Sequence, residues 1–457
     1  MSSDSQVPDS EPEFPSPNDN RASHQITKGS TFVSTTGTNI AIGVCGAIAA
    51  LLAARVLGPQ GRGELAAIQV WPTFLQVIAA AGMSEAISYF CARSPHQARQ
   101  YLSTGLLISL SSASAFMIVG YFFLPIALHS KGPGVVHDAQ AMLLIVPLYM
   151  IMWLPGQSFR GTGDYARWNL FRLLPTAGWM IILVGVTYLV RSKGRVVTPG
   201  QISGALVIET GLLGLLFLIV AYRRIQGNIR PERSFVLPLT QYGFPAMVGS
   251  LPTWLNLQLD QLIMASFIAP HQLGLYAVAV AWAQVNRPIV NALGAMMLPR
   301  LASEGDHLTR VQVFAKASRV GVIISIGLAV PVMLITPLAL PIIFGRAFSG
   351  SIPSAIILVA ASSVLGLSYI LSEALMGLGR TIGPAKAQTI GLVVTVATLA
   401  VLLPLFGILG AALSSLFGYS TTIIWLLVES RDATTLPIRQ MVAPHKSDLS
   451  FVKIRRS

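Results

Sequence analysis

Residues 249–300 read GSLPTWLNLQLDQLIMASFIAPHQLGLYAVAVAWAQVNRPIVNALGAMMLPR, two apolar segments joined by a tight polar turn. Each segment is long enough to cross a membrane as a helix, yet each carries polar residues at i, i+3 and i+7, which places them on one helical face. An ionised side chain at membrane depth costs about 2.5–3.5 kcal/mol on insertion scales, so such residues usually face a cavity or a partner. The residues of the two stripes are Thr253, Asn256 and Asp260, then Gln284, Arg287 and Asn291.

The composition of the whole chain indicates a membrane protein. Of its 457 residues, 53% are hydrophobic and only 11% are charged, whereas soluble domains are about 25% charged. Only helices and closed barrels satisfy the backbone in lipid, and the apolar runs here are long and do not alternate with polar residues. We therefore predict an all-α polytopic fold with about twelve transmembrane helices.

The predicted helices are separated by short connections, which leave no room for a large external domain. A Pro- and Ser-rich acidic tail, residues 1–28, precedes them; we expect it to be disordered and see no cleaved signal peptide in it. A basic tail, residues 431–457, follows them. The predicted limits of the helices are 31–57, 63–91, 101–127, 139–158, 169–190, 200–222, 238–268, 272–297, 317–345, 353–376, 385–406 and 408–430.

The Lys and Arg residues predict the orientation of the helices. They are concentrated in alternate connections, and cytoplasmic loops carry an excess of these residues. The distribution places both termini in the cytoplasm. Basic loop residues that set the orientation in the membrane also explain the net charge of +13. We therefore expect no nucleic-acid partner.

The chain contains an internal repeat. Four residues around the start of its second segment return in the same order and at the same spacing around the start of its eighth, and FRGTGDYAR at 159–167 is echoed by LMGLGR at 375–380. We predict two six-helix lobes related by a parallel repeat, residues 29–222 and 238–430, joined by a cytoplasmic linker at 223–237. The repeated glycines are expected to end turns or permit close helix contacts. The matched residues are Pro59, Gly63, Ala66 and Trp71, then Pro270, Gly274, Ala277 and Trp282.

Three phrases resemble a known family: ARVLGPQGRGELAA at 54–67, LDQLIMASFIAPHQLGLYAVA at 259–279 and EALMGLGR at 373–380. They look like the polysaccharide and oligosaccharide (Wzx-like) flippases of the multidrug/oligosaccharidyl-lipid/polysaccharide exporter superfamily, and the resemblance covers residues 30–430. It implies two lobes around a V-shaped central cavity, in the cytoplasmic membrane of a bacterium. It also implies ion-driven export of undecaprenyl-pyrophosphate-linked oligosaccharide to the outer leaflet, with H⁺ or Na⁺ as the coupling ion. Membrane lipids, a glycan polymerase and glycosyltransferases of the same pathway are the candidate partners.

Intramembrane carboxylates are the candidates for coupling to an ion. A carboxylate at this depth can bind a cation or take up a proton. Asp260 is the strongest candidate, and Glu209 and Glu373 lie deep in their own segments. A structural ion pair between Asp260 and Arg287 is the alternative.

Arginines are the candidates for holding an anionic head group. Their planar guanidinium donates two hydrogen bonds at once to a pyrophosphate. Arg287 lies within the eighth segment, and Arg172, which begins the fifth, could equally reach lipid phosphates. The remaining candidates for the cavity are Asn256, Gln284 and Asn291.

The sequence contains no GxxxxGK[ST] or HExxH motif and no Cys/His metal spacing. We therefore expect a secondary-active transporter without a catalytic, cofactor or metal site. The alternatives are a cation-coupled multidrug antiporter of the same superfamily, a polytopic glycan polymerase or glycosyltransferase, and a lipid II exporter. Cavity arginines favour an anionic substrate over a cationic drug, and the short external connections disfavour the enzymes.

Overall fold

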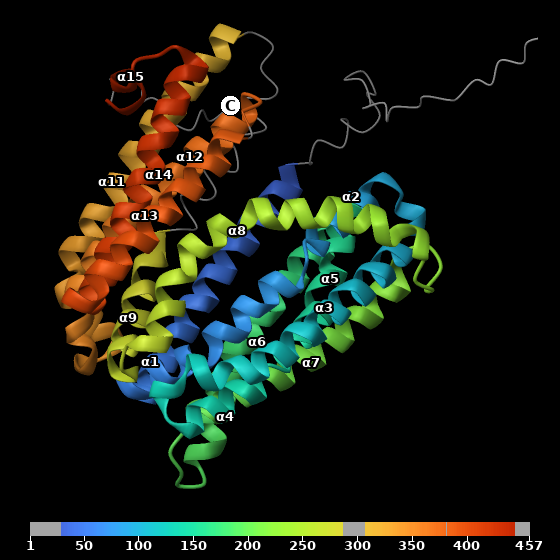
Figure 1. The fold of residues 1–457 in the computed structure, drawn as a ribbon, viewed down its shortest axis with the longest axis vertical. Helices are drawn as coiled ribbons and strands as arrows, with labels where there is room; N and C mark the ends of the chain where they lie inside the picture. The colour runs from blue at the N-terminus through green and yellow to red at the C-terminus, as the bar shows by residue number, and fades with distance from the viewer. Residues whose placement is uncertain (1–28, 287–306, 381, 444–457) are drawn as a thin grey trace, which may run out of the picture.

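The computed structural model describes residues 29–286, 307–380 and 382–443, with side chains for residues 34–285, 309–380 and 382–443. All regular structure in these residues is helical, and nine helical stretches among them are long and apolar enough to cross a membrane. The predicted all-α polytopic fold is confirmed. Figure 1 shows two groups of helices that diverge toward the end where α15 lies.

The N-terminal lobe consists of α1 to α7, and the C-terminal lobe of α8, α9 and α11 to α14, with α8 also packing against α1 and α2 of the first lobe (Figure 1). The bounds in the first lobe are α1 (Gly29–Ala79), α2 (Met83–Arg93), α3 (Ala98–Ala127), α4 (Pro133–Met142), α5 (Ile145–Gly161), α6 (Tyr165–Arg191) and α7 (Pro199–Arg224). Those that follow are α8 (Val236–Phe267), α9 (Pro270–Ala283), α11 (His307–Phe344), α12 (Ile352–Gly377), α13 (Ile382–Phe406), α14 (Ile408–Thr434) and α15 (Ile438–Val442). The short 3-10 turns are η1 (Pro95–Gln97), η2 (His129–Lys131), η3 (Arg233–Phe235), η4 (Gln284–Asn286) and η5 (Arg346–Ser351).

Helix α1 holds the first predicted span and most of the second. Its 51 residues exceed what a bilayer about 30 Å thick accommodates at 1.5 Å per residue. The chain turns at Gly58, where φ is 66° and ψ is −179°, a conformation that costs glycine little because it has no Cβ. The next residue is Pro59, whose missing N–H suits the start of the second span.

Four predicted helices differ in detail from the structure. The helix predicted at 317–345 begins ten residues earlier, at His307 of α11. The segment predicted at 63–91 is broken after Ala79, where Ala81 and Gly82 have positive φ, and resumes as α2. The segment predicted at 139–158 begins earlier, at Pro133, and is divided into α4 and α5. The eighth segment is helical only to Ala283 and continues as the 3-10 turn η4; its remainder lies outside the described residues.

The packing matches a protein surrounded by lipid. One buried apolar core extends from α1 of the N-terminal lobe into α9 and α12 of the C-terminal lobe. Large apolar side chains point outward from the spans, for example Phe122, which is 70% exposed, and Leu334, which is 75% exposed. In water such a surface would be unfavourable, but hydrocarbon chains solvate it.

Candidate functional site

Asp260 lies in the packed interior of the C-terminal lobe, where three helices meet. Its side chain is 6% exposed. The carboxylate accepts hydrogen bonds from the hydroxyl of Tyr276 on α9, from the hydroxyl of Ser415 on α14 at 3.4 Å, and from the backbone N–H of Gln261 at 2.7 Å. These partners are all neutral, so within the described residues the negative charge is held by hydrogen bonds and not by a cation.

Asn256, one helical turn before Asp260, extends this network to α13 and α14. Its Nδ2 donates to the backbone oxygen of Gln388 at 2.9 Å and to Gln388 Oε1 at 3.1 Å. The hydroxyl of Tyr419 donates to the Asn256 carbonyl at 2.8 Å. Asn256 is 3% exposed, and these hydrogen bonds connect α8 to α13 and α14.

The other two candidate carboxylates lie elsewhere. Glu209 on α7 is 7% exposed, and neither of its oxygens has a hydrogen-bond partner in the described part of the chain. It faces a cavity of about 290 Å³ in the N-terminal lobe, together with Gln69, Gln76 and Tyr149. Glu373 on α12 lines a separate cavity of the C-terminal lobe. The three carboxylates therefore occupy three distinct environments.

Arg172 belongs to a cluster of basic and aromatic side chains near the start of α6. Its guanidinium carbon lies 4.5 Å from the ring centre of Trp168, and its Nη2 donates to Asn39 Oδ1 at 2.7 Å. Arg160 lies 5.7 Å from the same ring. Stacking on the ring holds the planar guanidinium in place. The Nη1 atom of Arg172 is buried, with no hydrogen-bond partner among residues whose side chains are described, so it can donate to an anion.

The second polar stripe has only one described member. Arg287 and Asn291 lie outside the described residues, so neither their positions nor an ion pair with Asp260 is tested. Gln284 begins the 3-10 turn η4, directly after the end of α9. A 3-10 turn has about 3.0 residues per turn, so over residues 284–286 the backbone is not α-helical.

Sequence reasoning missed the residues that surround the candidates. Tyr276 was noted only as part of a motif, although its hydroxyl donates to Asp260. Trp168 was not singled out, although the guanidinium of Arg172 stacks on its ring. Trp168 lies four residues before Arg172, one helical turn away, which is a signal that the sequence does contain. The contact between Tyr276 and Asp260 joins two helices and has no such local signal.

The two lobes are joined by polar contacts at one end of the molecule. Arg55, three residues before the turn of α1 at Gly58, donates from Nε and Nη2 to the carbonyl oxygens of Ile343 and Ile342, each at 2.7 Å. Lys131 in η2 donates to the carbonyl oxygen of Ile268 just after α8. Cations of the N-terminal lobe thus bind the last carbonyls of two later helices, where the helix dipole is negative.

Comparisons with known proteins agree on family and fold. A model of the family described as polysaccharide biosynthesis protein matches residues 29–304. The chain is similar to an inward-facing multidrug resistance MATE family transporter of the MOP superfamily, at 16% identity and TM-score 0.70, covering 90% of this chain and 100% of that one. It is also similar to the lipid II flippase MurJ in an inward closed conformation, at 15% identity and TM-score 0.69, covering 91% and 89%.

A MATE transporter of Vibrio cholerae, VcmN, has the same fold at 14% identity and TM-score 0.57, covering 90% of this chain and 99% of that chain. None of the curated proteins compared with the chain matches it. At these identities the solved structures establish the fold, which is the one expected from the sequence resemblance.

Proposed function

Since this chain belongs to the polysaccharide biosynthesis protein family, we propose that it is an ion-coupled flippase for lipid-linked oligosaccharide. The substrate is an undecaprenyl-pyrophosphate-linked glycan, moved from the inner to the outer leaflet of the bacterial cytoplasmic membrane for surface polysaccharide synthesis. Both termini are cytoplasmic in this proposal, as the Lys and Arg bias of the loops favours. The lobes at 29–222 and 238–430 move as units about the linker at 223–237.

The observation that carries the substrate assignment is the unpartnered donor of Arg172. The buried Nη1 belongs to a guanidinium plane that Trp168 already orients, and Arg160 adds a second positive charge nearby. Charge-assisted hydrogen bonds from such a group suit a pyrophosphate. A cationic drug would be repelled by the same pair of arginines.

Asp260 supports ion coupling in this proposal. Its described partners are neutral, so uptake of H⁺ or Na⁺ changes the net charge of the site and the hydrogen bonds that connect α8, α9 and α14. Glu209 and Glu373 are further candidates, each in its own cavity. A coupling ion can drive transport only if it binds the inward-open and outward-open states with different affinity. A hydrogen-bond network between helices provides such a difference when the helices move.

The lobe contacts give the direction of opening. The contacts of Arg55 and Lys131 lie in connections that the charge bias assigns to the outside. The lobes diverge toward the opposite end (Figure 1). In this orientation the conformation is closed outward and accepts a head group from the cytoplasm while the prenyl chain stays in lipid. Breaking the outer contacts is then a step of alternating access.

The function is tested in a strain that lacks this protein. We expect lipid-linked oligosaccharide to accumulate in its membranes and surface polysaccharide to be lost. Wild type and Arg191→Ala, an exposed arginine at the other end of α6, should restore export, whereas Arg172→Ala should not. Normal surface glycan with increased sensitivity to cationic drugs would instead favour the antiporter. Incomplete chains in the outer leaflet would favour a polymerase.

A further inference from the structure

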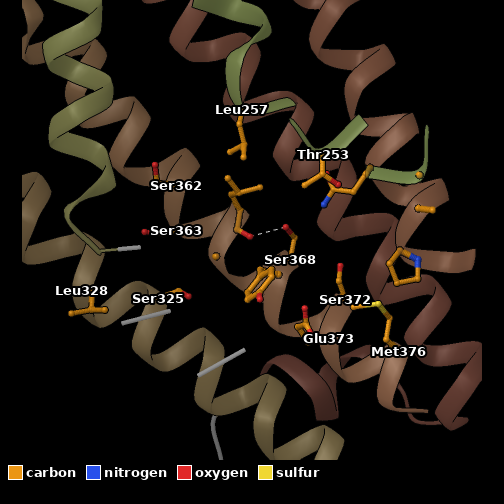
Figure 2. A pocket seen from close by; sticks show the side chains of 17 residues that line it. Thr253, Leu257, Ser325, Leu328, Ser362, Ser363, Ser368, Ser372, Glu373 and Met376 are labelled. Carbon is orange, nitrogen blue, oxygen red and sulfur yellow. Dashed lines mark hydrogen bonds between the residues drawn. The ribbon is translucent and has the colours of Figure 1, made fainter. Parts of the chain in front are cut away.

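A cavity of about 550 Å³ lies inside the C-terminal lobe, between α8, α11, α12 and α13. Figure 2 shows side chains of these helices directed around it. Its volume lies within the range of about 300–1,000 Å³ that is usual for small-molecule sites. Of the residues discussed above, Thr253, Glu373 and Gln388 take part in its lining, so the cavity calls for an explanation of its own.

Hydroxyl groups dominate the polar part of the lining. Ser325 and Ser372 are 4% and 9% exposed, and their hydroxyls have no hydrogen-bond partner among the residues that the structure describes. A buried hydroxyl without a partner is unfavourable, which points to a ligand that supplies one. Further hydroxyls come from Thr253, Ser362, Ser363 and Tyr369.

The charge and the polar groups of the lining indicate which part of the glycolipid the cavity binds. Among the described lining residues Glu373 alone is charged, so this part of the lining offers no cation for a pyrophosphate. A prenyl chain would leave the Ser325 and Ser372 hydroxyls unpaired. Sugar hydroxyls both donate and accept, as serine hydroxyls do, and a carboxylate accepts from them. The Tyr369 ring adds an apolar face with a polar tip.

The cavity is joined to the Asp260 network through one residue. Gln388 lines the cavity, and its Oε1 and backbone oxygen accept from Asn256, one turn from Asp260. Because Asn256 and Asp260 lie one turn apart on α8, a shift of this part of α8 would reach the cavity wall through the hydrogen bonds between Asn256 and Gln388. Such a link is what coupling between an ion site and a substrate site requires.

We propose that this cavity is a subsite for uncharged sugar units of the transported glycolipid, held by the hydroxyls of Ser325 and Ser372. The proposal rests on the flippase function proposed above and adds the place where the glycan is recognised. The pyrophosphate is bound at the arginine cluster of the N-terminal lobe, and the sugar is bound in the C-terminal lobe. A substrate that contacts both lobes binds more tightly to the conformation in which the lobes are placed to contact it together.

The first test measures protection of a cysteine placed in the cavity. Ser362→Cys is made in a Cys45→Ser/Cys91→Ala background, and its labelling by a thiol reagent is timed in the purified full chain. Two probes are compared: lipid-linked oligosaccharide extracted from the strain lacking the protein, and undecaprenyl pyrophosphate without sugar. We expect the first to slow labelling by about tenfold at saturating concentration and the second to leave it unchanged. Ser349→Cys in the exposed turn η5 is the control that neither probe protects.

The second test measures export and binding by serine variants. Ser325→Ala/Ser372→Ala should reduce affinity for the lipid-linked oligosaccharide by about tenfold, because two hydrogen bonds are lost, without changing affinity for undecaprenyl pyrophosphate. Ser414→Ala/Ser430→Ala is the matched control, since those serines are buried but donate to carbonyls of their own helix. Equal yield and melting temperature of the two double variants establish that both fold.

Each other outcome contradicts the subsite. Protection by both probes assigns the cavity to the prenyl chain or the pyrophosphate. Protection by neither, in a protein that restores surface glycan, removes the cavity from the substrate path. Protection by a cationic dye such as rhodamine 6G, in a protein that does not restore surface glycan, overturns the flippase function together with the subsite.

Discussion

Gly63 of α1 and Gly274 of α9 face each other across the two lobes. A Cβ added to Gly63 would overlap the carbonyl oxygen of Pro270 and lie 2.8 Å from the backbone nitrogen of Gly274. A Cβ added to Gly274 would overlap the carbonyl oxygen of Pro59 and lie 2.9 Å from the nitrogen of Gly63. The contact is reciprocal, as expected where equivalent surfaces of two repeats meet about a two-fold axis.

Substitution of either glycine should therefore weaken the contact between the lobes. In an unhindered helix Gly→Ala stabilises by up to about 1 kcal/mol, but here backbone atoms block the added methyl group, and overpacking typically costs about 1–3 kcal/mol. We expect Gly63→Ala and Gly274→Ala to lower the melting temperature in detergent and to reduce export. Gly204→Ala is the control, since its Cβ would meet no atom within 4 Å. Unchanged stability in both variants would show that the two helices separate readily.

The polar contacts of Arg55 and Lys131 should hold the same end of the molecule closed. Arg55→Gln/Lys131→Met removes donors to the ends of α11 and α8. Spin labels at Ser94→Cys and Asp432→Cys, in a background without the native cysteines, report the separation of the opposite ends. We expect that distance to shorten, because the lobes rotate and their opposite ends approach each other. Arg346→Gln, at an exposed residue of η5, is the control that leaves the distance unchanged. An identical distance distribution would mean that apolar packing alone sets the closed state.

Removing the charge of Asp260 should uncouple transport from the ion gradient. Coupling energies between sites are about 1–3 kcal/mol, so we expect Asp260→Asn to reduce gradient-driven export by about 5- to 150-fold. Tyr276→Phe removes a hydroxyl that donates to the same carboxylate and should destabilise the protein by about 1–3 kcal/mol. Asp432→Asn, at an exposed position of α14, should behave as wild type. Full gradient-driven export by Asp260→Asn would exclude Asp260 from coupling.

Arg172 should require its planar guanidinium and not only its charge. Arg172→Lys keeps the cation but loses the stacking on Trp168 and the paired donors. We expect it to bind lipid-linked oligosaccharide about tenfold more weakly than wild type, since a hydrogen bond to a charged group is worth about 1.5–3 kcal/mol. Affinity is measured on the purified protein, with Arg191→Lys as control. Wild-type affinity in Arg172→Lys would leave the residue with a purely electrostatic role.

Loss of the negative charge of Glu209 should not lower the stability of the protein. Both carboxylate oxygens lack partners in the described part of the protein, and a buried, unpaired ion is penalised by several kcal/mol. We expect Glu209→Gln to melt at the same temperature as wild type or higher, and to depend less on the ion gradient for export. A lower melting temperature would indicate a stabilising partner for the carboxylate. Gly178→Ala should destabilise, because its Cβ would overlap Glu209 Oε1.

The sequence by itself determined the fold class, most helix positions and the short list of intramembrane charges. Each rests on a local cause: long apolar runs must be helical in lipid, and a charge at membrane depth is costly enough to require a reason. The repeated glycine segments were also visible, because the spacing of Gly63 and Gly274 within their segments is a property of the chain.

Only the tertiary structure decided what these residues contact. It placed Asp260 with Tyr276 and Ser415, separated Asp260 from Glu209 and Glu373, and brought the hydroxyls of distant helices around one cavity. Helical periodicity fixes which residues share a face but not which other helix that face meets. That choice is made by packing between helices far apart in sequence, where close contact depends on side-chain volume and shape over the whole lobe.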